Sequence, residues 1–502
     1  MVVIDGESFT LEMAAAVAAG ATLVFGPNVE SRVKKNRAVV EKLIRSDKAI
    51  YGLNTGFGYF ANTKIPKNRL KKLQHNIVRS HAAGYGDPLP PRTARLCAAL
   101  RLNVLARGLT GVRFALLEQL RSLLNAGVSP MIPKQGSVGA SGDLIPLAHT
   151  ALALIGEGEV WVKGRRCSAR EGLGEAGLSP LQLAEKEGLS LINGTQAILS
   201  IGSLAILRSQ HLIHRVNQVT ALSYEALTAH ISPLDSRLHL ARGQLGQITC
   251  AEQIREQLEG SYLLREDLQH ARVQDPYSLR CAPQVHGASL DSLNFASAIV
   301  SRELNAVTDN PLVFTKEGEA VSGGNFHAQP LAMALDVAAM AMAELGNISD
   351  RRLEVLLNPQ QSKLSAFLAC EDGLHSGLMA LQYLSASLVN KNKLLANPAC
   401  TDSIPGNVGI EDHVSMGMTA AEKLKNVIEN VEVILALELF AAAQAVDMRK
   451  VKPLGKGTQR LYNLVRDVVP FLSEDRILSV DIERLVDKLR SLLPEGIVDE
   501  EK

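Results

Sequence analysis

The chain has 502 residues, of which 46% are hydrophobic and only 4% aromatic, so it can bury a large core of Leu, Ala, Val and Ile, which favours a large helical protein. Lys plus Arg (53) nearly balance Asp plus Glu (52), which argues against nucleic acid or an anionic membrane as a partner. The six cysteines are scattered and include no CxxC pair, which argues against a disulfide framework. The apolar run from Met13 to Phe25 follows acidic rather than basic residues, which argues against a secretory signal. Together these features predict a cytoplasmic protein.

The first segment of chemical interest is the glycine-rich Tyr51-Gly-Leu-Asn-Thr-Gly-Phe-Gly58. It lacks the Lys-Ser/Thr pair of a P-loop and the full dinucleotide fingerprint, so the pattern excludes both kinds of phosphate site. Two interpretations remain from the residues alone: a flexible loop with an incidental tyrosine, or a hinged loop that brings Tyr51 to a reacting group.

The most informative stretch is Gln135-Gly-Ser-Val-Gly-Ala-Ser-Gly-Asp-Leu-Ile-Pro146, because it contains Ala140-Ser141-Gly142. Attack of the Gly142 amide nitrogen on the Ala140 carbonyl closes a five-membered ring. Loss of water there and from Ser141 leaves an exocyclic methylidene, which is an electrophile. Gly142 has no Cβ to obstruct the sharp turn, and the serine carries a β-substituent that can be eliminated. Three small residues are by themselves more typical of an ordinary loop, so the surrounding sequence decides.

The surrounding sequence predicts a helix that begins directly after the tripeptide. Asp143 is a favourable N-cap and Pro146 is tolerated in a first turn, with Leu147, Leu152 and Ile155 continuing the helix. A helix N-terminus carries about half a positive elementary charge, which withdraws electron density from a ring formed there.

Further along the chain, Glu157 to Gly164 indicates a small hairpin, and long helical patterns follow beyond residue 200. We predict helices at 208–230, 290–305, 330–345, 378–395 and 424–439. The apolar 330–345 segment is too short, and too interrupted by Asp336 and Glu344, to span a membrane. The fold class is therefore predicted to be all-α, with an N-terminal domain at 1–200 that carries the glycine-rich loop and the tripeptide, and a long-helix bundle with C-terminal helices at 201–502.

Three shorter motifs lie in this region. Asn193-Gly-Thr-Gln196 and Gly323-Gly-Asn-Phe-His327 have the composition of turns. In Gln274-Asp-Pro-Tyr-Ser-Leu-Arg280 the proline opens a helical turn, which places Tyr277 and Arg280 on one face. The histidines show no metal-ligand spacing, so no metal is expected.

The segment Gly136 to His149 resembles the prosthetic-group segment of the aromatic amino acid ammonia-lyase and aminomutase family, whose members build 4-methylideneimidazol-5-one (MIO) from this triad. By motifs, the resemblance extends from about Tyr51 to His413. It implies MIO made from Ala140, Ser141 and Gly142 with no external cofactor, a fumarase/aspartase-like helical architecture, and a homotetramer whose active sites combine residues from several subunits.

The resemblance also implies a role for each motif. Tyr51 is the general base on a lid loop, and because a free phenol has a pKa near 10, this role requires a neighbouring positive potential. Arg280 grips the substrate carboxylate, with Gln274 and Tyr277 in polar roles beside the prosthetic group. Asn193 bonds to MIO and substrate, and Phe326 lies against both.

Two places indicate the substrate. Ser80-His81-Ala-Ala-Gly84 resembles the histidine-specific branch, and Glu411-Asp-His-Val-Ser415 has an acid where phenylalanine-type members have an amide. An imidazole needs polar partners, which His81 and Glu411 supply, whereas a phenyl ring would leave a buried Glu411 unpaired. Ile410 departs from the polar residue that many histidine-type members have. The expected reaction is elimination of ammonia from L-histidine to give trans-urocanate, a step of histidine degradation, with Tyr51, Tyr277 and Glu411 as catalytic residues.

Several alternatives stay open at this point. The substrate amine or the imidazole ring can be the group that attacks MIO. A phenylalanine or tyrosine lyase, or an aminomutase, would use the same triad. A serine hydrolase with Ser141 as nucleophile would need glycine where Asp143 stands. A non-catalytic homologue is argued against by the competent residue at every motif position.

Overall fold

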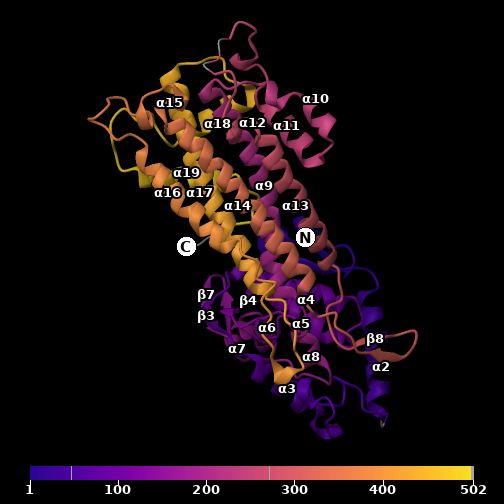
Figure 1. The fold of residues 1–502 in the computed structure, drawn as a ribbon. Helices are drawn as coiled ribbons and strands as arrows, with labels where there is room; N and C mark the ends of the chain where they lie inside the picture. The colour runs from indigo at the N-terminus through magenta and orange to yellow at the C-terminus, as the bar shows by residue number, and fades with distance from the viewer. Residues whose placement is uncertain (47, 269, 271, 499–502) are drawn as a thin grey trace.

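The computed structural model describes residues 1–498 except 47, 269 and 271. Long helices run side by side along the molecule, and the N-terminal part, indigo in Figure 1, surrounds their lower end. The strands are short, so the prediction of a mainly helical fold is confirmed. The boundary that we draw at residue 200 stays a prediction.

The N-terminal part alternates helices with short strands. Its elements are β1 (Val2–Ile4), α1 (Leu11–Ala18), β2 (Leu23–Phe25), α2 (Val29–Arg45), α3 (Leu70–His81), β3 (Tyr85–Pro88), α4 (Pro91–Ala106), α5 (Phe114–Asn125), β4 (Val128–Pro130), β5 (Pro133–Gln135), α6 (Leu144–Ile155), β6 (Glu159–Val162), β7 (Arg165–Ser168), α7 (Ala169–Glu175) and α8 (Glu187–Ile192).

The second part is built on four long helices, α9, α13, α14 and α17. Its elements are α9 (Gln196–Leu227), α10 (Ser236–Arg242), α11 (Leu245–Gln257), α12 (Tyr277–Arg280), α13 (Ala282–Glu303), β8 (Leu312–Phe314), β9 (Glu319–Val321), α14 (Gln329–Leu357), α15 (Pro359–Ser362), α16 (Met379–Leu395), α17 (Gly417–Arg449), α18 (Lys456–Arg466) and α19 (Leu478–Arg490).

The strands form small separate sheets. β1 and β2 are parallel, β3 pairs antiparallel with β5, and β8 pairs antiparallel with β9. In the three-stranded sheet β6 lies between β4 and β7, and Val162 pairs with Arg165 across the hairpin turn. The predicted hairpin is thus present, with its second strand just beyond Gly164.

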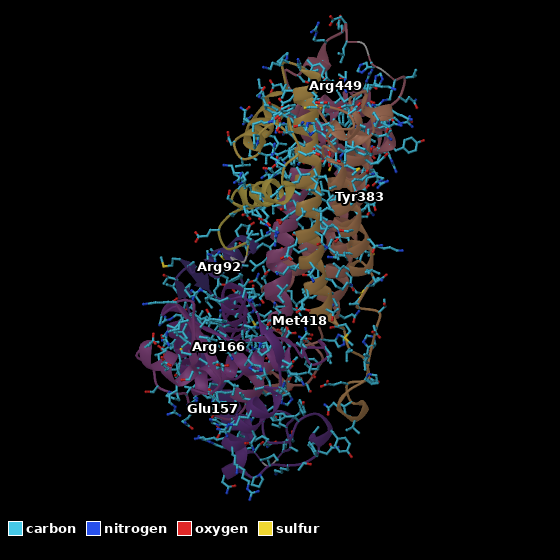
Figure 2. The ribbon with its side chains drawn as sticks, turned by 90° about the vertical axis from the view of Figure 1, so that its left-hand side faces the viewer. Arg92, Glu157, Arg166, Tyr383, Met418 and Arg449 are labelled. Atoms are coloured by element: carbon cyan, nitrogen blue, oxygen red, sulfur yellow. The ribbon has the colours of Figure 1, made fainter. Side chains whose placement is uncertain are left out.

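Helix α17 runs from the N-terminal part to the far end of the bundle, as Met418 and Arg449 mark in Figure 2. Its apolar residues recur at intervals of three and four, and Leu424, Ile428 and Val431 are fully buried. It packs against α14 and α9. The core therefore follows the whole length of the bundle.

Four predicted helices are longer in the structure: α13 begins at Ala282 rather than at residue 290, α17 spans Gly417–Arg449 rather than 424–439, and α9 and α14 also differ. The predicted start of one at Arg208 is wrong, because α9 begins at Gln196, and the preceding turns are buried on all sides and show no polar face. The predicted end of another at Leu345 is also wrong, because α14 continues to Leu357. The polar residues in that extension have buried partners: Ser385 donates to Asp350 at 2.6 Å, and Arg352 pairs with Glu438 at 2.6 Å.

Two helical stretches, 187–227 and 329–357, are long and apolar enough by composition to cross a membrane. The apolar window of the first is entirely buried inside the fold, and that of the second is 72% buried. Packing against neighbouring helices therefore accounts for their composition.

Candidate active site

A cavity of about 1060 Å³ lies beside the start of α6. Its wall comes from the loop after α2, from α3, from the turn after α8, from the loop after β9 and from the segment before α17. Among the predicted site residues, those that line it are Tyr51, His81, Ala140, Ser141, Asn193, Phe326 and Glu411.

The Ala140–Gly142 loop connects β5 to α6, as the sequence predicts. Gly142 has a φ of +72°, and a Cβ there would collide with the carbonyl oxygen of Gly194. The amide of Asp143 donates to the same oxygen at 2.6 Å. Only glycine meets both the conformation and the close approach, so the loop is fixed against the turn that follows Asn193.

Asp143 stands at the predicted N-cap position, but its carboxylate does not cap α6. It accepts hydrogen bonds from Ser137 Oγ at 2.6 Å and from the amide of Ile198 at 2.8 Å, in the first turn of α9. Burial raises the pKa of Asp143 to about 6 against these bonds. The side chain thus joins the tripeptide loop to a second helix start.

Tyr51 lies in the loop between α2 and α3, and its hydroxyl accepts from the Gly58 amide at 3.4 Å. Burial raises its pKa above the ordinary value, and the charge of Glu411 acts in the same direction. Among the described residues of this single chain, no cation lowers the pKa of Tyr51, so they do not supply the positive potential that a tyrosine base requires.

Glu411 lies directly against the tripeptide: Ser141 Oγ donates to its Oε1 at 2.8 Å. Asn407 Nδ2 donates to the same oxygen at 3.4 Å. The backbone carbonyl of Glu411 accepts from the Gly406 amide at 2.9 Å, and Ile410 lies in the cavity wall with 59% of its surface exposed. The unusual isoleucine thus leaves Glu411 facing Ser141.

His81 is the last residue of α3. Its Nδ1 lies 2.9 Å from the carbonyl oxygen of Ile77. A carbonyl can only accept, so this contact assigns the proton of a neutral imidazole to Nδ1 and leaves Nε2 as an acceptor.

Asn193 follows the last residue of α8 and is 3% exposed. Its Nδ2 donates to the carbonyl of Asn310 at 3.4 Å, and its Oδ1 is buried without a hydrogen-bond partner among the described residues. Phe326 enters the cavity wall from the turn after β9, which the sequence predicts as a turn.

The structure of one chain does not bring the 274–280 motif to this cavity. Tyr277 and Arg280 form α12, which lies at the upper end of the molecule in Figure 1, whereas α6 and α8 lie at the lower end. The two side chains share a face, as predicted, with the guanidinium carbon 4.7 Å from the ring centre. Arg280 also donates to Gln274, and Tyr277 is 68% exposed.

Sequence reasoning missed other residues that line the cavity, among them Phe60, Asn310, Ser322 and His413. No spacing in the sequence points to Asn310, which lies in the connection between α13 and β8. Within the described ranges, no group of three or more His, Cys, Asp or Glu side chains is arranged to hold a metal ion.

A mainly helical bundle with this tripeptide, tyrosine and glutamate in one cavity defines a class of lyases, and comparison identifies the family. The aromatic amino acid lyase family model matches residues 9–467, and the chain belongs to that family.

Its relatives include a histidine ammonia-lyase from Anaeromyxobacter sp. (strain K), 48% identical over 98% of each chain. Among solved structures, the histidine ammonia-lyase from Trypanosoma cruzi is 41% identical with a TM-score of 0.90, covering 97% of this chain and 93% of that one. Tyrosine aminomutase from Streptomyces globisporus is 38% identical with a TM-score of 0.93, covering 98% of this chain and 97% of that one.

Proposed function

We propose that this chain is an ammonia-lyase that converts L-histidine to trans-urocanate and ammonia. The observation that carries the proposal is the presence of His81 and Glu411 in one cavity with Ser141 and Tyr51. The names of the relatives above support the same substrate. No observation favours a phenylalanine or tyrosine lyase or an aminomutase.

Ala140, Ser141 and Gly142 form MIO in this proposal. Three features support the fit: the left-handed conformation of Gly142, the start of the twelve-residue helix α6 beside it, and the buried Oδ1 of Asn193. This oxygen has no hydrogen-bond partner among the described residues, so it can accept a hydrogen bond from MIO or the substrate. MIO supplies an electrophilic carbon to the cavity.

Tyr51 takes the β-proton of the substrate as the general base. A phenolate is the competent form, yet burial and Glu411 both raise the pKa of Tyr51 in one chain. An approaching cation would lower that pKa again, and a guanidinium from another chain meets this need.

The assembly is a homotetramer in which the α12 segment of one subunit completes the cavity of another. The exposure of Tyr277 and the placement of α12 at the far end from α6 support this arrangement. Large apolar side chains are also exposed along α13, α14 and α16: Phe295, Met333, Met340, Tyr383 and Leu394. Arg280 of the partner subunit then holds the substrate carboxylate, beside Gln274 of the partner subunit and Tyr277 of the partner subunit.

Glu411 selects the imidazole. Formation of MIO removes the Ser141 hydroxyl, which is the donor 2.8 Å from Glu411 Oε1. An imidazole N–H can replace that donor, whereas a phenyl ring cannot. A phenyl ring would leave this partly buried carboxylate oxygen with only the 3.4 Å bond from Asn407 Nδ2, and the lost hydrogen bond, worth about 1.5–3 kcal/mol when it is made to a charged group, disfavours phenylalanine.

The cytoplasm is the proposed compartment. All six cysteines are free, which supports a reducing environment.

The proposal is tested by adding L-histidine to the purified protein and following urocanate absorbance. The parent chain should form urocanate and Ser141→Ala should form almost none. Glu411→Gln should lower kcat/KM for L-histidine by about tenfold or more, with a smaller effect on any L-phenylalanine or L-tyrosine turnover. Absence of urocanate from the parent chain, or faster turnover of L-phenylalanine than of L-histidine, would refute the substrate assignment.

A further inference from the structure

Three parts of the cavity rest on one short stretch, Thr308 to Pro311, between α13 and β8. The carbonyl of Asn310 accepts from Asn193 Nδ2 at 3.4 Å. On the other side, Asn310 Oδ1 accepts from Ser322 Oγ at 3.0 Å and from the Gly323 amide at 2.8 Å. These last two residues begin the turn that carries Phe326.

The same stretch also touches the lid loop. Gly52, next to Tyr51, has a φ of +74°, and a Cβ there would lie 2.7 Å from Pro311 Cδ and 2.8 Å from Leu189 Cδ2. The backbone beside Tyr51 therefore lies directly on the proline. Asn193, the Phe326 turn and the Tyr51 loop thus share one support.

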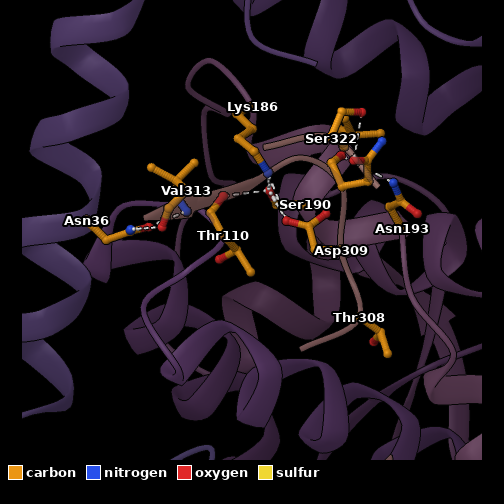
Figure 3. A network of polar contacts seen from close by, with 12 residues as sticks. Asn36, Thr110, Lys186, Ser190, Asn193, Thr308, Asp309, Val313 and Ser322 are labelled. Atoms are coloured by element: carbon orange, nitrogen blue, oxygen red, sulfur yellow. Dashed lines mark hydrogen bonds and ion pairs between the residues drawn. The ribbon is translucent and has the colours of Figure 1, made fainter. Parts of the chain in front are cut away.

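A buried cluster of charges, none of which lines the cavity, is bonded to this stretch. Lys186 Nζ donates to Asp309 Oδ2 at 2.8 Å. Ser190 Oγ lies 3.1 Å from the same oxygen and 2.9 Å from the carbonyl oxygen of Thr110, and its single proton can be donated to either acceptor. Arg101 Nη2 lies 3.7 Å from Asp309 Oδ1, and Arg101 Nη1 donates to the carbonyl of Thr308 at 2.7 Å. Figure 3 shows Lys186, Ser190 and Asp309 directed toward one another, with Asn193 and Ser322 to their right.

All three charged side chains are fully buried. Burial lowers the pKa of Lys186, and it lowers the pKa of Arg101 to about 10, while the charge of Asp309 opposes both shifts. A buried ion pair adds little net stability because each ion loses its hydration, but its directed bonds restrict geometry. That restriction bears on catalysis because Thr308 and Asp309 directly precede Asn310 and Pro311, which contact the three cavity segments.

We propose that Asp309 is a positioning residue for the reaction: held by Lys186, Ser190 and Arg101, it fixes Asn193, the Phe326 turn and the Tyr51 loop relative to one another. The inference rests on the proposed function for its kinetic readout. Asp309 itself does not line the cavity.

The test compares Asp309→Asn with Glu432→Gln in the full-length protein. Both replace an ion-paired carboxylate by its amide, fully buried at Asp309 and largely buried at Glu432. Glu432 pairs with Arg208 between α9 and α17, with 11% and 6% of the side chains exposed, and neither residue lines the cavity. Asp309→Asn should lower kcat for L-histidine by about tenfold or more with KM changed less than about threefold. Glu432→Gln should keep kcat within about twofold even where it lowers Tm as much.

A second readout does not depend on activity. Hydrogen–deuterium exchange in peptides covering 193–196 and 322–327 should rise severalfold in Asp309→Asn and stay unchanged in Glu432→Gln. If Asp309→Asn does not fold, Ser190→Ala removes one bond to Asp309 and should show the same pattern at smaller size.

Unchanged exchange in these peptides, or a folded Asp309→Asn with kcat within about twofold of the parent, would overturn the inference. The inference would also be overturned if Glu432→Gln lost as much kcat as Asp309→Asn while the two variants had the same Tm. A parent chain without L-histidine turnover would count against the proposed function instead, and the exchange comparison would then decide the role of Asp309.

Discussion

At the scale of single residues, Tyr51 needs a lowered pKa to act as the base, and its surroundings in one chain raise that pKa instead. Its hydroxyl is buried near Glu411, and both influences raise its pKa, whereas proton abstraction needs the phenolate. The sequence pointed to this tyrosine through the family resemblance and to the need for a cation. It contained no signal for the opposing effect of Glu411, because those two residues are far apart in the chain.

We predict that kcat rises with pH through the apparent pKa of Tyr51, because only the deprotonated phenol accepts the proton. Tyr51→Phe should remove this rising limb and lower kcat by about 10²–10⁴-fold. Arg280→Gln should move the limb to higher pH, since loss of a nearby positive charge raises the pKa of a phenol.

The measurement is kcat for L-histidine between about pH 6 and pH 10. A Tyr51→Phe variant that keeps the limb would show that another group is the base. If the rising limb of Arg280→Gln lay at the same pH as that of the parent, the Arg280 guanidinium would not be the group that lowers the pKa of Tyr51.

At the scale of elements, the tripeptide loop depends on the turn between α8 and α9. The Gly194 carbonyl accepts from Asp143 and leaves no room for a side chain on Gly142. The sequence predicted both turns, but their contact joins segments about fifty residues apart and has no sequence pattern.

Gly142→Ala should therefore prevent ring formation. A left-handed conformation costs an alanine about 1–2 kcal/mol, and the collision with the Gly194 carbonyl adds to it. The matched control is Gly164→Ala, whose φ is +80° but whose Cβ would meet nothing within 4 Å.

Peptide mass spectrometry reads the outcome. Gly142→Ala should retain the unmodified tripeptide, and Gly164→Ala should be modified like the parent. Full modification of Gly142→Ala would contradict the geometric argument.

The helix boundaries also show which parts of the fold the sequence pattern can predict. Where one helix face is polar, as in α17, periodicity locates the helix but not its ends, since α17 spans Gly417–Arg449 and the prediction covers 424–439. The start of α9 lacks a polar face, and the end of α14 contains Asp350 and Arg352, whose burial depends on partners on other helices. Tertiary pairing of this kind cannot be inferred from local pattern.

At the scale of the whole molecule, the predicted site residues divide into two groups at opposite ends of the bundle. The cavity group surrounds Ser141, and the α12 group contains Arg280. The resemblance supplied the residues of both groups, but the separation became visible only in the fold. The Asp309 cluster had no sequence signal at all, because Arg101, Lys186 and Asp309 lie in distant segments and Lys186 stands among other charges, between Glu185 and Glu187.

The proposed division of the site between subunits predicts complementation. Ser141→Ala and Arg280→Ala should each be inactive, but equal co-assembly should restore about a quarter of the parent activity, since half the cavities and half the α12 segments are intact. Co-assembly of Ser141→Ala with Tyr51→Phe should restore nothing, because Ser141 and Tyr51 line the same cavity of one chain.

Activity of the mixed tetramers is measured after co-expression with two affinity tags. A Ser141→Ala and Arg280→Ala mixture as inactive as its parents would place both residues in the same site of one chain. Activity from the Ser141→Ala and Tyr51→Phe mixture would contradict the cavity described here.

The most direct test of the account is the mass of the peptide that contains Ala140, Ser141 and Gly142, taken from protein with measured L-histidine turnover. We predict that this peptide has lost two water molecules. The corresponding Ser141→Ala peptide should not form the methylidene, because alanine has no hydroxyl group to eliminate. An active preparation in which the parent peptide has its full, unmodified mass would contradict the account.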